Sequence, residues 1–191
     1  MPKVVNATEQ RRQIRQAARE VFRRRGVVGL AHVAEAAGIG RSSVYHYYPD
    51  KGALVRHLVR DLIAEEEALF QGAADGPGRP LERIERLVGA TPGLFPEWAQ
   101  AGRLLLELRS KDARLFRAFF RRIREALAGA IREGQHAGEI DRGLEPELAA
   151  ATVIGAIDGL LLQVLVDAAA FPEPDRLRET LVTIVRKALQ P

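Results

Sequence analysis

Seven polar side chains that can contact nucleic acid lie within residues 41–51 of this 191-residue chain. They are Arg41, Ser42, Ser43, Tyr45, His46, Tyr47 and Lys51. The Arg41 guanidinium can bind a guanine edge or a phosphate, and the small hydroxyl side chains of Ser42 and Ser43 allow close approach to DNA. His46 could contact either a base or a phosphate. These residue types predict a DNA-reading surface.

The flanking residues predict the two short helices that would carry this surface. The first helix would have an apolar face formed by Val33, Ala34 and Ala37. Gly38 can then adopt the left-handed backbone conformation that a Cβ would penalise. In the second helix Val44 and Tyr48, four residues apart, face inward and leave the polar side chains outside. This is the layout of a helix-turn-helix, whose second helix enters the major groove of DNA.

The positive charge of the chain is confined to the same segment. Residues 1–60 contain 12 Lys and Arg against 4 Asp and Glu, whereas the whole chain has a net charge of only +4. The remaining residues are therefore net acidic. A generally solvated surface does not explain this asymmetry, but a phosphate-binding surface requires it.

Three stretches of this segment resemble, in order and spacing, the DNA-binding domain of the tetracycline-repressor-like (TetR) family. They are Ile14–Gly26, Ala34–Ile39 and Val44–Leu54, and the resemblance covers about residues 9–56. The family usually begins its second helix with Ser or Thr, where this chain has Gly29 or Leu30, and caps its third with Ser, where this chain has Gly40. Glycine costs only a few tenths of a kcal/mol against a good cap. We therefore expect the fold to be the same as in the family. We also expect the second helix to lack the hydroxyl that normally contacts a DNA phosphate.

This resemblance implies a homodimeric, ligand-responsive transcriptional repressor. Its helix-turn-helix would bind double-stranded, palindromic operator DNA, with Tyr45, Tyr47 and Lys51 as phosphate contacts. Its C-terminal helices would dimerise and enclose a small apolar or amphipathic effector. Effector binding would move the two reading helices apart, which requires the effector to prefer the spread state.

Helical periodicity along the rest of the chain predicts an all-α fold of about nine helices. We place the helix-turn-helix domain at residues 1–52 and the effector-binding and dimerisation domain at residues 53–191. Residues 72–80, rich in Gly and Pro, form the clearest loop. A long helix is expected from Asp112 to near residues 134–138, an eighth from Pro146, and a ninth ending near Leu189.

The last two predicted helices are candidates for the dimer interface. The segment Ala149–Val166 is apolar on all sides, which is more than one subunit can bury, and its Gly155 and Gly159 would allow close approach. The last helix has apolar residues at helical spacing: Leu177, Leu181, Ile184, Val185 and Leu189. With their symmetry mates the two helices would form a four-helix interface. The alternative is that both helices are buried within one subunit.

Six side chains are candidates for the effector pocket: Trp98, Arg103, Glu107, Phe116, Phe120 and Asp158. Asp158 lies in an apolar helix, so it must be paired, protonated or hydrated. It could equally be the structural partner of a buried arginine, and the aromatic residues could equally belong to the core. Arginines of the long helix could hold the phosphates of an acyl-CoA-like effector, although a solvated face is the simpler explanation: Arg114, Arg117, Arg121, Arg122 and Arg124.

The sequence contains no motif for catalysis, a metal or a cofactor. Its four His residues are scattered, and it has no Gly-rich phosphate loop or serine elbow. We therefore expect no enzyme activity, cofactor or metal site. The absence of Cys and of a secretory signal fits a cytoplasmic protein. Asp158, near the centre of the apolar stretch 149–166, makes a buried helix a better interpretation than a membrane span.

Two other classes of function stay open at this point. One is an all-α enzyme or a lipid or small-molecule carrier whose basic N-terminus is incidental. The other is an architectural protein that binds DNA without sequence preference. Steep salt dependence of duplex DNA binding separates a regulator from the first, and discrimination between operator and random DNA separates it from the second.

Overall fold

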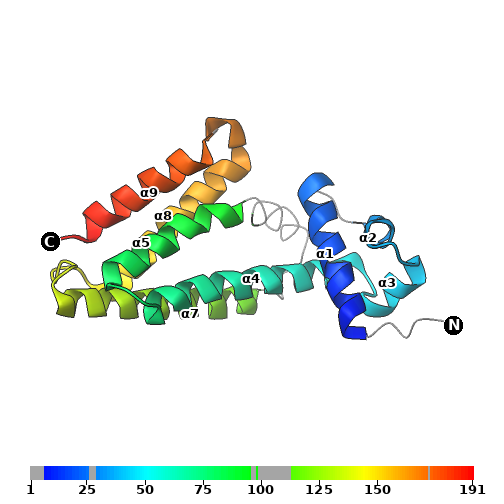
Figure 1. Ribbon diagram of the computed structural model, residues 1–191, viewed down its shortest axis with the longest axis horizontal. Helices are drawn as coiled ribbons and strands as arrows, with labels where there is room; N and C mark the ends of the chain where they lie inside the picture. Colours follow the sequence, from blue (N-terminus) through cyan, green and yellow to red (C-terminus); the bar gives the residue numbers. More distant parts are fainter. Residues whose placement is uncertain (1–6, 26–28, 96–97, 99–112, 172) are drawn as a thin grey trace. The chain divides into compact units, whose positions relative to one another are not determined.

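The computed structural model of the protein describes residues 7–25, 29–95, 98, 113–171 and 173–191, which contain eight α-helices and no strand (Figure 1). The all-α fold expected from the sequence is confirmed. The described residues fall into two compact units, one ending at Leu62 and the other beginning at Ile63. The domain boundary that we expect after residue 52 stays a prediction.

The N-terminal unit contains α1 (Ala7–Arg25), α2 (Leu30–Ala37), α3 (Arg41–Tyr47) and the first part of α4 (Lys51–Asp75). Each helix contributes an apolar side chain with no exposed surface to one core: Ile14, Val33, Val44 and Leu54. These residues lie at the positions that helical periodicity directs inward. Burial of Val44 fixes the rotation of α3 and so decides which of its side chains face outward.

Gly38 makes the turn between α2 and α3. Its φ of +65° lies in the left-handed region, where a Cβ is penalised. The backbone N–H of Gly38 donates to the Glu35 carbonyl, and that of Ile39 to the Ala34 carbonyl, both at 3.1 Å, and these bonds close the end of α2. Gly29 and Gly40 are the N-caps of α2 and α3, and neither helix has a side-chain cap.

The C-terminal unit is built around the long helix α7 (Ala113–Ala137). It also contains the rest of α4, α5 (Pro80–Ala90), a 3-10 turn (Thr91–Leu94), α8 (Pro146–Val166), a second 3-10 turn (Ala168–Ala170) and α9 (Pro174–Leu189). Helix α7 packs against α5 and α8, and α5 packs against α9. Large apolar side chains that are almost wholly withdrawn from solvent form the core, including Phe70, Ile84, Ile123, Leu127 and Ile131. The bounds of α7, α8 and α9 agree closely with those expected from the sequence.

A buried arginine fixes the loop between α4 and α5. The Arg83 guanidinium donates to the carbonyl oxygens of Ala74 and Gly76 at 2.9 and 3.1 Å and pairs with Glu133 of α7. Only 6% of the Arg83 side chain is exposed. The glycine and proline content of the sequence predicted this loop. It did not predict that Arg83 binds the backbone carbonyl groups of the loop.

Helix α8 is only partly covered by its own chain. It is the one helix among the described residues that is long and apolar enough to cross a membrane, and 22% of its most apolar window is buried. Leu162 and Val166 are 59% and 80% exposed. The alternative in which one subunit buries this helix is therefore wrong, and burial of α8 in an assembly stays a prediction.

Helix α9 behaves differently from α8. Leu181, Val185 and Leu189 are buried within the chain, whereas Ile184 is 59% exposed. Three of the five apolar residues assigned to a dimer face on this helix are therefore unavailable to a second subunit. The helical spacing predicted for these residues is correct. However, Leu181, Val185 and Leu189 face the interior of their own protomer, because α5 packs against α9.

Candidate nucleic-acid interface and effector site

The outward side of α3 carries the side chains that the sequence predicts for DNA contact. Arg41, Ser42, Tyr45 and His46 are exposed, and Ser43 and Tyr47 are half-buried. Lys51 is half-buried at the first residue of α4. Tyr48 is only 5% exposed, and this burial raises the pKa of its phenol. The inward placement expected for Val44 and Tyr48 is confirmed.

Tyr47 connects α3 to α1. Its hydroxyl donates to Gln10 Oε1 at 3.1 Å, and the Arg11 guanidinium lies 5.5 Å from the centre of its ring. Gln13 Nε2 donates to the carbonyl of Ala37 at 2.7 Å and so connects α1 to the end of α2. Sequence reasoning missed both glutamines, because their role depends on how the helices pack. Tyr45, 52% exposed, is the tyrosine more accessible to a ligand.

The arginines of α1 are partly engaged within the N-terminal unit. Arg12 pairs with Glu9 at 2.6 Å, and Arg15 lies 3.6 Å from Asp61 of α4. Arg15 also contacts Nε2 of His57 at 3.4 Å. Burial lowers the pKa of His57, which favours the neutral imidazole. The contacts of Arg15 with Asp61 and His57 connect α1 to α4, so part of the basic excess seen in the sequence has a structural use.

Glu66 of α4 and Asp158 of α8 are two carboxyl groups of the C-terminal unit whose pKa values are raised. Glu66 is only 9% exposed. Burial, followed by the charge of Asp158, raises the pKa of Glu66 to about 7, while the indole N–H of Trp98 lowers it. Burial raises the pKa of Asp158 to about 6. No Arg, Lys or His of the described part of the chain contributes to either shift.

Aromatic side chains lie near Glu66. The indole Nε1 of Trp98 is buried without a partner at strict hydrogen-bonding geometry, and the indole N–H lowers the pKa of Glu66. The Trp98 and Phe119 rings stack at 6.1 Å between centroids, and Phe119 lies 5.1 Å from Phe120. We call Glu66, Asp158, Trp98 and Phe119 the acidic–aromatic cluster.

The cluster contains some of the predicted effector residues and omits others. It includes Trp98 and Asp158, with Phe120 at its edge. Phe116 is half-buried, while Arg103 and Glu107 lie outside the described residues. Sequence reasoning missed Glu66, which stands in the middle of three consecutive acidic residues. The signal was present in the spacing, because Leu62, Glu66 and Phe70 are four residues apart and all three are buried.

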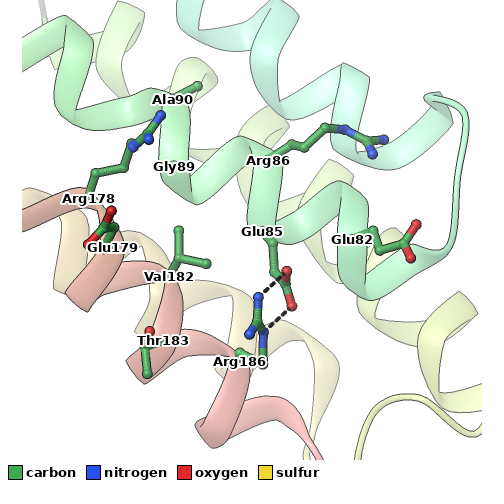
Figure 2. Close-up of a pocket in the computed structure, with 10 residues that line it drawn as sticks. All are labelled: Glu82, Glu85, Arg86, Gly89, Ala90, Arg178, Glu179, Val182, Thr183 and Arg186. Carbon is green, nitrogen blue, oxygen red and sulfur yellow. Dashed lines mark hydrogen bonds and ion pairs between the residues drawn. The ribbon is translucent and has the colours of Figure 1, made fainter. Parts of the chain in front are cut away.

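A separate groove lies between α5 and α9 (Figure 2). It has a volume of about 890 Å³. The Arg186 guanidinium and the Glu85 carboxylate pair across it at 2.6 and 2.7 Å. The four predicted effector residues that the structure describes, Trp98, Phe116, Phe120 and Asp158, do not line this groove. Among the residues that the structure covers, no group of His, Asp or Glu could hold a metal ion.

Helix α3 is short and exposed, it follows the turn at Gly38, and the burial of Val44 fixes its rotation. This arrangement is a helix-turn-helix, which is typical of DNA-binding regulators. Residues 14–58 match the family model for bacterial regulatory proteins of the tetR family, and residues 108–190 match that for the C-terminal part of BetI-type transcriptional repressors. The chain belongs to the TetR family of transcriptional regulators.

Individual relatives support this assignment. The HTH-type transcriptional regulator TtgR of Pseudomonas putida is 29% identical over 171 residues, which cover 81% of this chain and 80% of TtgR. The HTH-type transcriptional repressor LfrR of Mycolicibacterium smegmatis is 34% identical over 86 residues, which cover 45% and 46% of the two chains. A putative regulator from Saccharomonospora viridis, solved in complex with choline, has a TM-score of 0.81 at 23% identity, covering 96% of this chain and 99% of that one.

Proposed function

We propose that this protein is a homodimeric repressor that binds palindromic operator DNA through the outer side of α3 and is released by a small-molecule effector. The observation that carries the proposal is the exposure of Arg41, Ser42, Tyr45 and His46 on one helix whose rotation is fixed by buried Val44. A guanidinium, hydroxyls and an imidazole on one exposed surface suit a groove edged by phosphates.

The partly uncovered α8 supports the dimer. Leu148, Leu162 and Val166 expose large apolar surfaces on this helix, and Ile184 does so on α9. Such a surface is costly in water unless a second chain covers it. Two helix-turn-helix units in a symmetric dimer would also read two half-sites, which explains how a seven-residue helix can achieve specificity.

The effector-binding half of the proposal is supported by the relatives. Structural neighbours with this fold have been solved with choline and, in the regulator SmeT, with triclosan. Among the described residues, no group of His, Asp or Glu could hold a metal ion. We propose a cytoplasmic location and no enzymatic activity because the relatives are transcriptional regulators.

The experiment is a selection of bound fragments from the genome of the source organism, followed by gel shifts with the best fragment. Arg41→Ala should abolish the shift, and Tyr45→Phe and Tyr47→Phe should weaken it. Arg117→Ala is the matched control, because Arg117 is an exposed arginine of the C-terminal unit. An unchanged shift with Arg41→Ala would count against the assignment of α3 as the reading helix. Size-exclusion chromatography should show every variant at the wild-type elution volume.

A further inference from the structure

The Tyr47 hydroxyl at the end of α3 has a fixed partner on α1. It donates to Oε1 of the half-buried Gln10 at 3.1 Å. Gln10 lies four residues before Ile14, whose side chain has no exposed surface, so both residues are on the side of α1 that packs on the helix-turn-helix. Gln13 donates to the Ala37 carbonyl at 2.7 Å and holds this side of α1 on the end of α2. Helix packing therefore sets the position of Gln10 beside Tyr47.

Two exposed polar side chains flank the ring of Tyr47. The Arg11 guanidinium of α1 lies 5.5 Å from the centre of the ring. The imidazole of His46 meets the ring edge-on, with 5.3 Å between the two centroids. A guanidinium stacked on an aromatic ring is stabilised there by the charge of the ring face. A phosphate that approaches the Tyr47 hydroxyl therefore also meets the positive charge of Arg11.

The single proton of the Tyr47 hydroxyl restricts its hydrogen bonds. While this proton is donated to Gln10, the hydroxyl cannot donate to a DNA phosphate, whose oxygens only accept. The Gln10 amide removes this conflict, because it carries a donor as well as an acceptor. Half a turn about its last side-chain bond places Nε2 where Oε1 lay. A carboxylate at the same position could only accept.

Accepting the proposed function, we propose that Gln10 is a positioning residue for DNA binding, whose amide accepts from the Tyr47 hydroxyl in the free protein and reverses to donate to it when that hydroxyl contacts a phosphate. In the free protein the hydrogen bond orients the phenol in advance, which reduces the loss of side-chain freedom on binding. In the complex the proton of the hydroxyl goes to the phosphate oxygen, and Nε2 of Gln10 donates to the phenol oxygen.

A double-mutant cycle tests the positioning role. The affinity of the full-length protein for the selected genomic fragment is measured by fluorescence anisotropy at one salt concentration. Gln10→Ala should weaken binding about two- to tenfold, which is the loss expected for one hydrogen bond. In the Tyr47→Phe background the same change should have no further effect, because the hydroxyl that Gln10 positions is gone. Wild-type affinity in Gln10→Ala, or an equal loss in both backgrounds, would refute this role.

Gln10→Glu tests the reversal of the amide. A carboxylate keeps the Tyr47 proton and cannot donate to the phenol oxygen, so this variant should bind at least about tenfold more weakly than Gln16→Glu. Gln16→Glu is the matched control, because it adds the same charge at an exposed position of α1. The difference between the two variants should shrink in the Tyr47→Phe background. Equal affinities, or a difference that persists undiminished without the hydroxyl, would refute the reversal.

The same measurements distinguish this inference from the proposed function. Wild-type binding that is lost in Arg41→Ala but unchanged in the Gln10 variants would overturn only the role of Gln10. Failure of the wild-type protein to bind any duplex would overturn the proposed function, and the positioning role with it.

Discussion

Replacing Glu66 by Gln should stabilise the protein at alkaline pH, although the residue is buried. The pKa of Glu66 rises from 4.5 to about 7 on folding. Each pKa unit corresponds to about 1.4 kcal/mol, so full ionisation of Glu66 costs the folded state about 3 kcal/mol. Glutamine has nearly the same shape and does not ionise, so the variant avoids this cost.

The sign of the effect follows from which state holds the proton more tightly. The folded protein has the higher pKa, so Glu66 imposes no penalty below about pH 4.5, where it is protonated in both states. Between pH 4.5 and about 7 the unfolded state ionises first, and the folded protein loses stability as the pH rises. The pKa of Asp158 is raised to about 6, so ionisation of Asp158 also destabilises the folded state as the pH rises, over a lower pH range. Asp158 is present in both wild type and Glu66→Gln.

The assay is urea unfolding of wild type, Glu66→Gln and Glu65→Gln at about pH 5 and about pH 8, at one fixed protein concentration. The advantage of Glu66→Gln over wild type should grow by about 2–3 kcal/mol between these pH values. Glu65→Gln is the control for the same substitution at an exposed position of the same helix. A pH-independent difference, or a variant less stable than wild type at pH 8, would mean that a cation of the protein already compensates Glu66.

Three further predictions concern glycines and the apolar face of α8. Gly38→Ala should destabilise the protein by about 1 kcal/mol in urea unfolding, because the φ of +65° is costly for alanine while no atom lies within 4 Å of the added Cβ. Gly134→Ala should lower the free energy of unfolding by about 1–3 kcal/mol, because the added Cβ would lie 2.5 Å from Ile140 Cδ1. The control is Gly129→Ala on the same helix, where the added Cβ meets no atom within 4 Å, and it should be neutral or stabilising. Leu162→Asp should convert the dimer to a monomer in light scattering; a dimer of unchanged affinity would refute the assignment of the α8 face.

Local sequence signals were sufficient for the order of the described helices and for the bounds of several of them. The stripe from Ile14 to Val21 places α1, and Gly38 places the turn, because both signals act through neighbouring residues. Glu145 caps α8 by accepting from the Glu147 and Leu148 N–H groups, next to the Pro146 that marked this start in the sequence. Periodicity, caps and breakers are properties of short segments.

Contacts between distant segments could not be predicted in the same way. Glu66 belongs to a run of three glutamates that suggests a solvated helix end, and only the packing of α4 buries it. The burial of Leu181 and Val185 depends on α5, which is about a hundred residues away in the chain. The hydrogen bond between Tyr47 and Gln10 joins residues 37 positions apart.

The affinity of the wild-type protein for DNA, measured as a function of sequence and salt, tests the central claim most directly. Fluorescence anisotropy with a selected genomic fragment and with a random duplex of equal length, at several salt concentrations, would give the sequence preference and the salt dependence of the affinity. We predict that the selected fragment binds about a thousandfold or more tightly at physiological salt, and that the logarithm of its affinity falls linearly with the logarithm of salt concentration. Equal affinity for both duplexes, or no binding of either in dilute buffer, would contradict the account.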